Sequence, residues 1–340
     1  MSVPVLSFFN NKGGVGKTSL VYHLAWMYAD KNWRVLAADL DPQANLTATF
    51  LDEDRLESVV FEEGGKVDTI YECVQPLIRG VGDISAPVLE SIDAESLSEN
   101  LALLAGDLSL SRFEDDLAGA WPRCADGNER AFRVESAFWR ILQGAASNHD
   151  ADLVLMDLGP NLGAINRSAL IAADYVVIPL APDLFSIKGM RNLGPTLRNW
   201  RNQWNHRLDK NPVPDLSLPK GRMESVGYTV QQHSVRLDRP VKAYQRWIRR
   251  MPNVYREEIL EESEGDSVDV RSDPHCLALL KHYRSLMPLA QEARKPMFKL
   301  KYADGAIGAH AQAAKDSYDD FERLADEIAK NTQMQPREVA

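Results

Sequence analysis

Residues 12–19 read Lys-Gly-Gly-Val-Gly-Lys-Thr-Ser. An apolar run at residues 3–9 comes directly before them, and a helix-like stretch at residues 20–28 follows. A strand, a glycine-rich turn and a helix in this order direct consecutive backbone N–H groups at a polyphosphate, and a lysine neutralises its charge. The stretch therefore predicts a phosphate-binding loop made of Lys12, Gly13, Gly14, Val15, Gly16, Lys17, Thr18 and Ser19.

One position departs from the usual pattern of such loops. A glycine is expected five residues before the Gly-Lys pair, but Asn11 stands there and a second lysine, Lys12, follows it. With this deviation residues 10–18 resemble the ParA/Soj/MinD family of ATPases, in particular its ParA-type partition members. The resemblance implies that two chains form a homodimer around ATP, in which Lys12 reaches the partner's phosphates and stabilises transition-state charge. The alternative is a glycine turn before an ordinary helix, with Lys12 in solvent.

Further short apolar runs predict the fold. They cover residues 34–38, 153–156 and 175–180, and residues 224–230 form another candidate strand. Continuous apolar runs that end in polar residues are typical of parallel strands buried on both faces. We therefore expect a doubly wound α/β fold, a mostly parallel sheet with helices on both faces, of the P-loop NTPase type.

The domain organisation is expected to be simple. Residues 1–330 are predicted to form one ATPase domain, with helical or loop insertions at about 51–148 and 205–295. Helical spacing of apolar residues predicts a final helix over residues 317–330. Residues 331–340 are expected to be a flexible tail.

The resemblance also assigns roles to side chains around the loop. Lys17 pairs with the β- and γ-phosphates of ATP, and the Thr18 hydroxyl binds Mg²⁺. Asp157 follows an apolar strand and holds Mg²⁺ through water. Asp41, in the run Asp-Leu-Asp-Pro-Gln-Ala-Asn at residues 39–45, orients the attacking water, because a carboxylate with a pKa of about 3.9 is too weak a base to deprotonate it. Asp39 is expected to be structural.

Composition excludes several classes of protein. The three cysteines are far apart and form no C-x-x-C pair, so neither a disulfide framework nor a zinc site is indicated. No apolar run reaches the roughly 18 residues of a membrane span. We therefore expect a cytoplasmic protein without a membrane partner. The resemblance implies a bacterial or archaeal protein that associates with the nucleoid.

Charge is distributed unevenly over a chain whose net charge is −10. Residues 236–256 carry seven basic side chains against one aspartate, and residues 188–207 carry five Lys/Arg and no acid. Helical spacing places Lys242, Arg246, Arg249 and Arg250 on one side of a helix, where they could bind a phosphate backbone without reading its sequence. A solvated helix face or a protein-binding surface are the alternatives.

Two classes of function follow. In the first, an ATP-switched dimer binds non-specific DNA and positions a plasmid, chromosome or other cargo, and an activating partner of ParB-like role stimulates hydrolysis. In the second, the ATPase is a regulatory switch in a protein assembly without a DNA role. The fold also includes iron–sulfur reductases and amide-forming synthetases, but no cysteine-containing switch motif or second substrate pocket is visible in the sequence.

Overall fold

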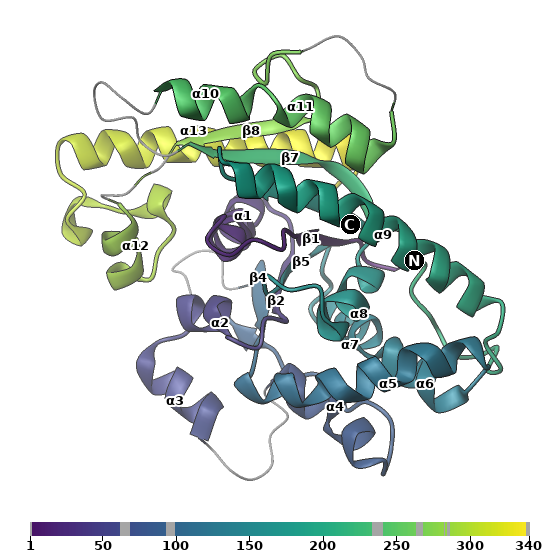
Figure 1. The fold of residues 1–340 in the computed structure, drawn as a ribbon. Helices are drawn as coiled ribbons and strands as arrows, with labels where there is room; N and C mark the ends of the chain where they lie inside the picture. Colours follow the sequence, from purple (N-terminus) through teal and green to yellow (C-terminus); the bar gives the residue numbers. More distant parts are fainter. Residues whose placement is uncertain are drawn as a thin grey trace.

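The computed structural model describes residues 2–61, 69–92, 99–232, 241–262, 268–281, 283 and 286–337. Its central feature is a sheet that, within these residues, has eight strands in the order β3-β4-β2-β5-β1-β6-β7-β8 (Figure 1). All neighbouring strands are parallel except β3, which pairs antiparallel with β4 at one edge. The strands are β1 (Val5–Phe8), β2 (Val35–Asp39), β3 (Glu90–Ser91), β4 (Leu101–Leu104), β5 (Leu153–Asp157), β6 (Tyr175–Leu180), β7 (Glu224–Gln232) and β8 (Cys276–Lys281).

Helices cover both faces of the sheet, because successive strand residues point to opposite sides. One core contains Leu36 and Val154 with helices α4 to α9 and α11, and the other contains Val35 and Leu155 with α1, α2, α12 and α13. The helices are α1 (Lys17–Asp30), α2 (Asn45–Phe50), α3 (Glu53–Phe61), α4 (Ile70–Arg79), α5 (Glu114–Ala125), α6 (Glu129–Glu135), α7 (Ala137–Asn148), α8 (Ala164–Ala172), α9 (Leu184–Leu208), α10 (Val241–Ile248), α11 (Met251–Val254), α12 (Met287–Ala293) and α13 (Ala309–Thr332). Short turns of 3₁₀- or π-helix are η1 (Leu108–Phe113), η2 (Tyr255–Leu260), η3 (Met297–Lys299) and η4 (Tyr302–Asp304).

The sheet confirms the doubly wound α/β fold that the sequence predicts. The order of strands reverses at β1, since the chain proceeds to β2 on one side and β6 lies on the other. In such sheets ligands bind beyond the carboxyl ends of the strands at the point of reversal. The glycine-rich loop leaves β1 at this point, so the topology alone places it at the binding edge.

Four strands, β3, β4, β7 and β8, lie inside segments that the sequence assigned to insertions, and of these only β7 was predicted as a strand. β4 pairs with β2, and β8 pairs with β7, so both belong to the sheet. The insertion at residues 51–148 also supplies α4 to α7, which cover one face. These segments are therefore in part structural core.

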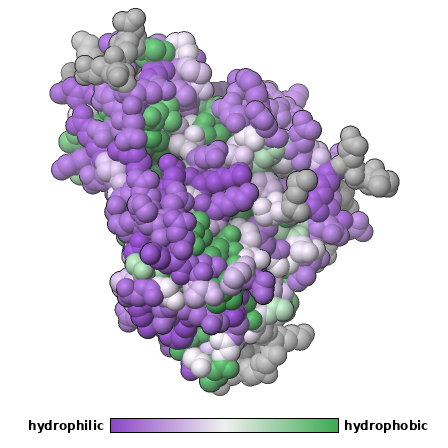
Figure 2. Space-filling model, turned by 90° about the vertical axis from the view of Figure 1, so that its right-hand side faces the viewer, coloured by the Kyte–Doolittle hydropathy of each residue, from purple (hydrophilic) through white to green (hydrophobic). Residues whose placement is uncertain are grey.

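The final helix is longer than predicted, because it runs from Ala309 to Thr332. Met334 beyond it is buried, and the backbone N–H of Arg337 donates to Asp152 Oδ1 at 3.0 Å. Thr332 and Met334 are therefore buried within the segment expected to be a flexible tail, and residues 338–340 lie outside the described part. On the face shown in Figure 2 hydrophilic residues predominate, with smaller apolar areas between them. No helix in the described residues is long and apolar enough to cross a membrane.

Candidate nucleotide site

The glycine-rich loop has the backbone that anion binding requires. Gly14 and Gly16 adopt φ values of 72° and 77°, a left-handed conformation that glycine adopts without steric cost. Gly16 is the N-cap of α1, and no side chain caps that helix. The first N–H groups of α1 are therefore left to bind an external anion, and the helix dipole favours negative charge there.

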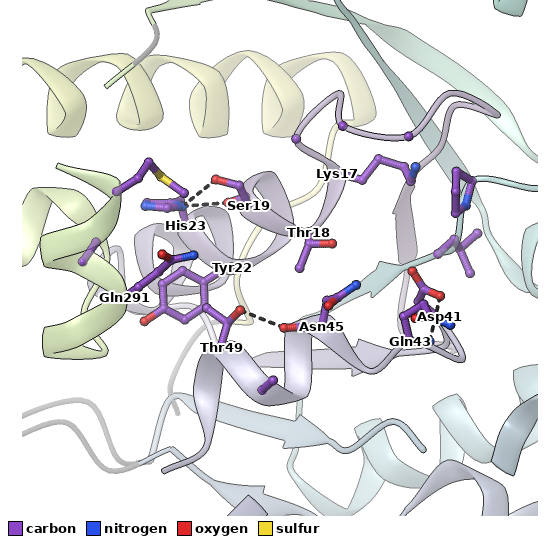
Figure 3. Close-up of a pocket in the computed structure, with 18 residues that line it drawn as sticks. Lys17, Thr18, Ser19, Tyr22, His23, Asp41, Gln43, Asn45, Thr49 and Gln291 are labelled. Carbon is purple, nitrogen blue, oxygen red and sulfur yellow. Dashed lines mark hydrogen bonds between the residues drawn. The ribbon is translucent and has the colours of Figure 1, made fainter. Parts of the chain in front are cut away.

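Lys17 lies under this loop rather than in solvent. Its Nζ donates to the backbone oxygens of Asn10 at 3.2 Å and Lys12 at 3.4 Å. Burial lowers the pKa of Lys17, while Asp157 and Asp41 oppose the shift. Figure 3 shows Lys17 and Thr18 at one side of the cavity and Asp41 at another. The ammonium is thus positioned by the loop's own carbonyls before any ligand arrives.

Two aspartates end neighbouring strands in register. Asp39 on β2 is directly opposite Asp157 on β5, and both are fully buried. Asp39 accepts hydrogen bonds from the N–H and hydroxyl of Thr47, both at 2.8 Å. It therefore fixes the start of α2, which agrees with the structural role expected for it.

Asp157 has a different environment. Neither of its carboxylate oxygens has a hydrogen-bond partner among the described residues, although both are buried. Burial and the nearby Asp39 carboxylate raise the pKa of Asp157. A buried carboxylate without a partner requires compensation, which a divalent cation held by Asp157 and the Thr18 hydroxyl would supply. The residues present therefore fit the Mg²⁺ that the sequence predicts.

Asp41 lies in the loop after β2, and its carboxylate faces Gly159 in the loop after β5. Its Oδ1 accepts from the N–H of Gln43 at 3.0 Å, which orients the carboxylate. A Cβ at Gly159 would lie 3.1 Å from the same oxygen, so a side chain there would shift the Asp41 carboxylate by a few tenths of an ångström. Asp41 and Lys17 line one cavity of about 710 Å³, together with Gly13, Gly14, Gly16, Thr18 and Ser19.

Lys12 lies at the rim of this site. Its Nζ forms an ion pair with Asp183, whose other oxygen caps α9 by accepting from the N–H of Ser186 at 2.9 Å. Although burial opposes it, the hydrogen bond from Lys12 lowers the pKa of Asp183. Lys12 is thus paired within its own chain, and this pairing could not be predicted because Asp183 is 171 residues away in the sequence.

The cavity extends beyond the predicted residues. Tyr22 and His23 of α1, Thr49 of α2 and Gln291 of α12 line its other end (Figure 3). His23 accepts from the N–H of Met297 through Nε2 at 3.2 Å, and its Nδ1 lies 2.7 Å from the Ser19 carbonyl. These positions carry no motif, so only the packing of α12 against α1 and α2 reveals them.

Glu114 is another residue that sequence reasoning missed. It starts α5, and its two carboxylate oxygens accept from the N–H groups of Ala164 at 2.5 Å and Ile165 at 2.8 Å. These are the first N–H groups of α8, so Glu114 caps that helix from another element. It thereby fixes the end of the loop that begins at Asp157.

The two basic segments have different environments. On α9, Arg198 pairs with Glu261, Arg201 donates to the carbonyls of Arg222 and Met223, and Arg207 lies over the ring of Trp121. These three of the five basic side chains of this run are therefore engaged within the chain, which leaves fewer of them free to bind a phosphate backbone.

The segment around α10 remains exposed. Arg246, Arg249 and Arg250 are exposed, and Trp247 beside them is half-buried against the core. The helix ends at Ile248, so Arg249 and Arg250 lie in the following turn and not on a continuous helix face as predicted. Lys242 is in α10, but its side chain lies outside the described part.

Comparison with known proteins agrees with this geometry. A family model described as an AAA domain matches residues 3–210. The chromosome partitioning protein ParA of Caulobacter vibrioides is 31% identical over 208 residues, which cover 60% of this chain and 66% of that protein. The chain is a ParA-family AAA domain. The IncC protein of Escherichia coli is 30% identical over 57% of this chain and 45% of its own length, so the chain spans about half to two thirds of these ParA-family relatives.

Solved structures show the same ParA-family fold. The Corynebacterium diphtheriae protein DIP2308 superimposes with a TM-score of 0.71 at 23% identity, over 97% of this chain and 99% of that one. A Cyanothece McdA variant in complex with ATP gives a TM-score of 0.62 at 15% identity, over 100% and 99%. At these identities the likeness concerns the fold, which includes β4 and β8 because the matches cover almost the whole chain.

Proposed function

We propose that this chain binds Mg²⁺–ATP in the cavity beside the glycine-rich loop and hydrolyses it as a partition-type ATPase. The observation that carries this proposal is the buried, unpartnered carboxylate of Asp157 next to a prepositioned Lys17. Mg²⁺, held by Thr18 and Asp157, would neutralise charge on the transferred phosphoryl group. Lys17 binds the phosphates, and Asp41 orients the attacking water. Slow intrinsic turnover is expected.

Hydrolysis in this proposal requires an ATP-bound sandwich homodimer. The face around the site supports it, since Leu162, Leu184 and Phe185 are exposed apolar residues at the same edge of the sheet. Leu184 and Phe185 directly follow Asp183, the partner of Lys12. A second copy that covers this face would bury them and bring a second lysine to the phosphates. Lys12 then leaves Asp183 and acts in the partner's site.

In the cell, the ATP dimer is proposed to bind non-specific DNA and to position a cargo, with hydrolysis stimulated by a partner protein of ParB-like role. The name of the Caulobacter vibrioides relative, a chromosome partitioning protein, and the exposed arginines Arg246, Arg249 and Arg250 support this. A switch that acts on a protein partner without DNA is the second candidate. The internal contacts of the α9 arginines favour this second candidate, because they leave a smaller exposed basic surface than the sequence indicates.

ATP turnover tests the site. We expect hydrolysis that depends on Mg²⁺ and rises more than linearly with protein concentration. Asp41→Ala should keep ATP affinity within about threefold but lower turnover by about 100-fold or more, because orientation of the water is lost. An Asp41→Ala variant with normal turnover would remove Asp41 from the proposed role.

DNA binding separates the two cellular functions. A random-sequence duplex is titrated with ATP, with ADP and without nucleotide, at two salt concentrations. ATP-dependent, salt-sensitive binding that Arg249→Glu/Arg250→Glu abolishes supports partition, since backbone contacts release counterions. Absence of binding in every state would favour the protein-partner switch.

A further inference from the structure

A second cavity, of about 740 Å³, lies behind the nucleotide site and is not explained by ATP binding. Buried apolar residues of several elements line it, namely Trp26, Phe50, Leu51, Ile92 and Leu300, with the half-buried ring of Phe298. Its volume falls in the range of small-molecule sites, which are mostly apolar with a few polar groups that fix orientation. An apolar lining of this size is therefore suited to the flat or branched body of an organic ligand.

The charges around the second cavity are mainly positive, in contrast to the net charge of −10 of the whole chain. Its lining includes five basic side chains and two acidic ones. Some of the basic groups are already paired, since Lys299 contacts Asp30 at 2.6 Å, and Lys295 contacts Asp304 at 3.0 Å. The basic residues are Arg55, Arg294, Lys295, Lys299 and Lys301, and the acidic residues are Asp52 and Glu90.

Arg294 differs from these paired groups. Its guanidinium donates to the backbone carbonyl of Leu51, and no carboxylate within the described residues pairs with it. It is also the C-cap of α12 in a left-handed conformation, with φ 49° and ψ 42°. Glycine is the usual residue at such a cap, because a residue with a side chain is strained in this conformation. Arg294 therefore brings to the cavity a positive charge that no described carboxylate neutralises, as a site for an anion requires.

We propose that the second cavity binds a small organic anion with an aromatic or similarly flat apolar body. Trp26, Phe298 and the aliphatic floor would cover the body, while the guanidinium of Arg294 binds the anionic group as a planar, bidentate donor. This site is separate from the phosphate-binding loop and does not rest on the ATPase activity proposed above.

The same elements line the second cavity and the nucleotide cavity, with different residues facing each of them. On α1, Tyr22 lines one cavity and Trp26 the other; on α12, Gln291 and Arg294 divide in the same way. Residues of α2 also line both, and Figure 1 shows α2 and α12 flanking α1 on the same side of the molecule. Since α2 follows the loop of Asp41, occupancy of the second cavity is expected to change nucleotide affinity, and the effect must be reciprocal.

The test uses 8-anilinonaphthalene-1-sulfonate, a fluorescent aromatic anion, and the full chain with and without saturating ADP and Mg²⁺. Arg294→Gly removes the cation and relieves the backbone of α12, so a loss of binding cannot be attributed to misfolding. Gln333→Gly is the matched control, because Gln333 is the left-handed C-cap of α13, is exposed and does not line either cavity. Ser91→Trp is a second variant that fills the cavity from an exposed position.

We expect the probe to bind with ADP present, and its affinity to fall about tenfold or more in Arg294→Gly and Ser91→Trp but not in Gln333→Gly. Equal affinity in all variants, or displacement of the probe by ADP in direct competition, would overturn the proposal. To measure the coupling, the ADP dissociation constant is determined with and without saturating probe. We expect the probe to change this constant by at least twofold in the unmodified chain and to leave it unchanged in Arg294→Gly. An unchanged ADP dissociation constant in the unmodified chain would refute the coupling. The probe titration alone would then decide whether the site exists.

Discussion

Two lysines of one loop have opposite environments. Lys17 is buried under the loop carbonyls, whereas Lys12 is partly exposed and paired with Asp183. We therefore expect Lys17→Gln to lower nucleotide affinity by about 100-fold or more, and Lys12→Gln to leave it within about threefold while abolishing turnover. Fluorescent-nucleotide titration and phosphate release measure the two effects. Similar behaviour of both variants would contradict separate roles for the lysines.

The ion pair between Lys12 and Asp183 should influence the protein concentration at which turnover is half-maximal. If the pair must open before Lys12 reaches the partner's phosphates, Asp183→Asn should lower the protein concentration needed for half-maximal turnover by about two- to fivefold, since a partly exposed pair contributes up to about 1 kcal/mol. Asparagine can still cap α9 through its side-chain oxygen. Asp183→Ala, which removes the cap as well, separates the two roles. An increased concentration requirement in Asp183→Asn would show that the pair belongs to the active state.

At the residue scale, the sequence predicted the positions that gather at the cavity because they follow strand ends or lie within one motif. The pairing of Asp183 with Lys12 and the role of Glu114 were not predicted, since each acts on a segment at least 50 residues away. The internal contacts of the α9 arginines were not predicted for a related reason. A basic run in the sequence does not show whether carbonyls and acids from other elements surround it.

At the scale of elements, α9 packs closely against η2 at one glycine. A Cβ on Gly194 would lie 1.8 Å from the carbonyl oxygen of Glu258, so the two backbones could not keep this distance. Gly194→Ala should therefore destabilise the protein by about 2 kcal/mol or more. Gly144→Ala in α7 is the control, because its nearest contact would be 3.9 Å and alanine favours helix by up to about 1 kcal/mol. Urea unfolding of both variants measures the difference, and equal effects would refute it.

His23 connects α1 to η3 and to Phe321 of α13, on which it stacks. Burial lowers the pKa of His23 to about 4, from an ordinary value of 6.5. Because the pKa of His23 is lower in the folded chain, the unfolded chain binds a proton at His23 at a higher pH than the folded chain does. The contribution of the neutral ring to the free energy of unfolding is therefore complete above pH 6.5 and is lost as the pH falls toward 4. The loss amounts to about 2 kcal/mol by pH 5. Unfolding at pH 7 and pH 5 should show it, and the difference between the two values should shrink in His23→Gln, which has no titrating ring.

The strands that the sequence predicted are those with long apolar runs next to recognisable loops. β4 has only four residues, Leu101–Leu104, and lies between segments without such loops. β8 likewise follows an acidic segment that indicated an exposed connection. A short apolar run does not distinguish a buried strand from part of a helix, so only pairing with β2 and β7 identifies these two.

At the scale of the whole molecule, the face around the nucleotide cavity should be the one that a second copy covers. We expect light scattering to show a dimer with ATP and a monomer with ADP. Phe185→Asp should weaken the ATP dimer by about tenfold or more, because it places a charge on an apolar contact. Val81→Asp is the control, since Val81 is 77% exposed but lies in the turn after α4. Equal dimerisation of both variants would place the interface elsewhere.

The two ends of the described chain meet at the opposite edge of the sheet. Asp152, just before β5, binds the N–H of Arg337 through one oxygen and that of Arg34, just before β2, through the other. Gln143 binds both backbone groups of Val3 nearby, and Figure 1 shows the two ends close together. A fluorophore, tether or additional domain joined to either end would therefore leave the molecule on the side away from the phosphates. Immobilising the protein by its ends would keep the nucleotide face open to solution, and linking the ends would give a circular chain that could be reopened at another loop.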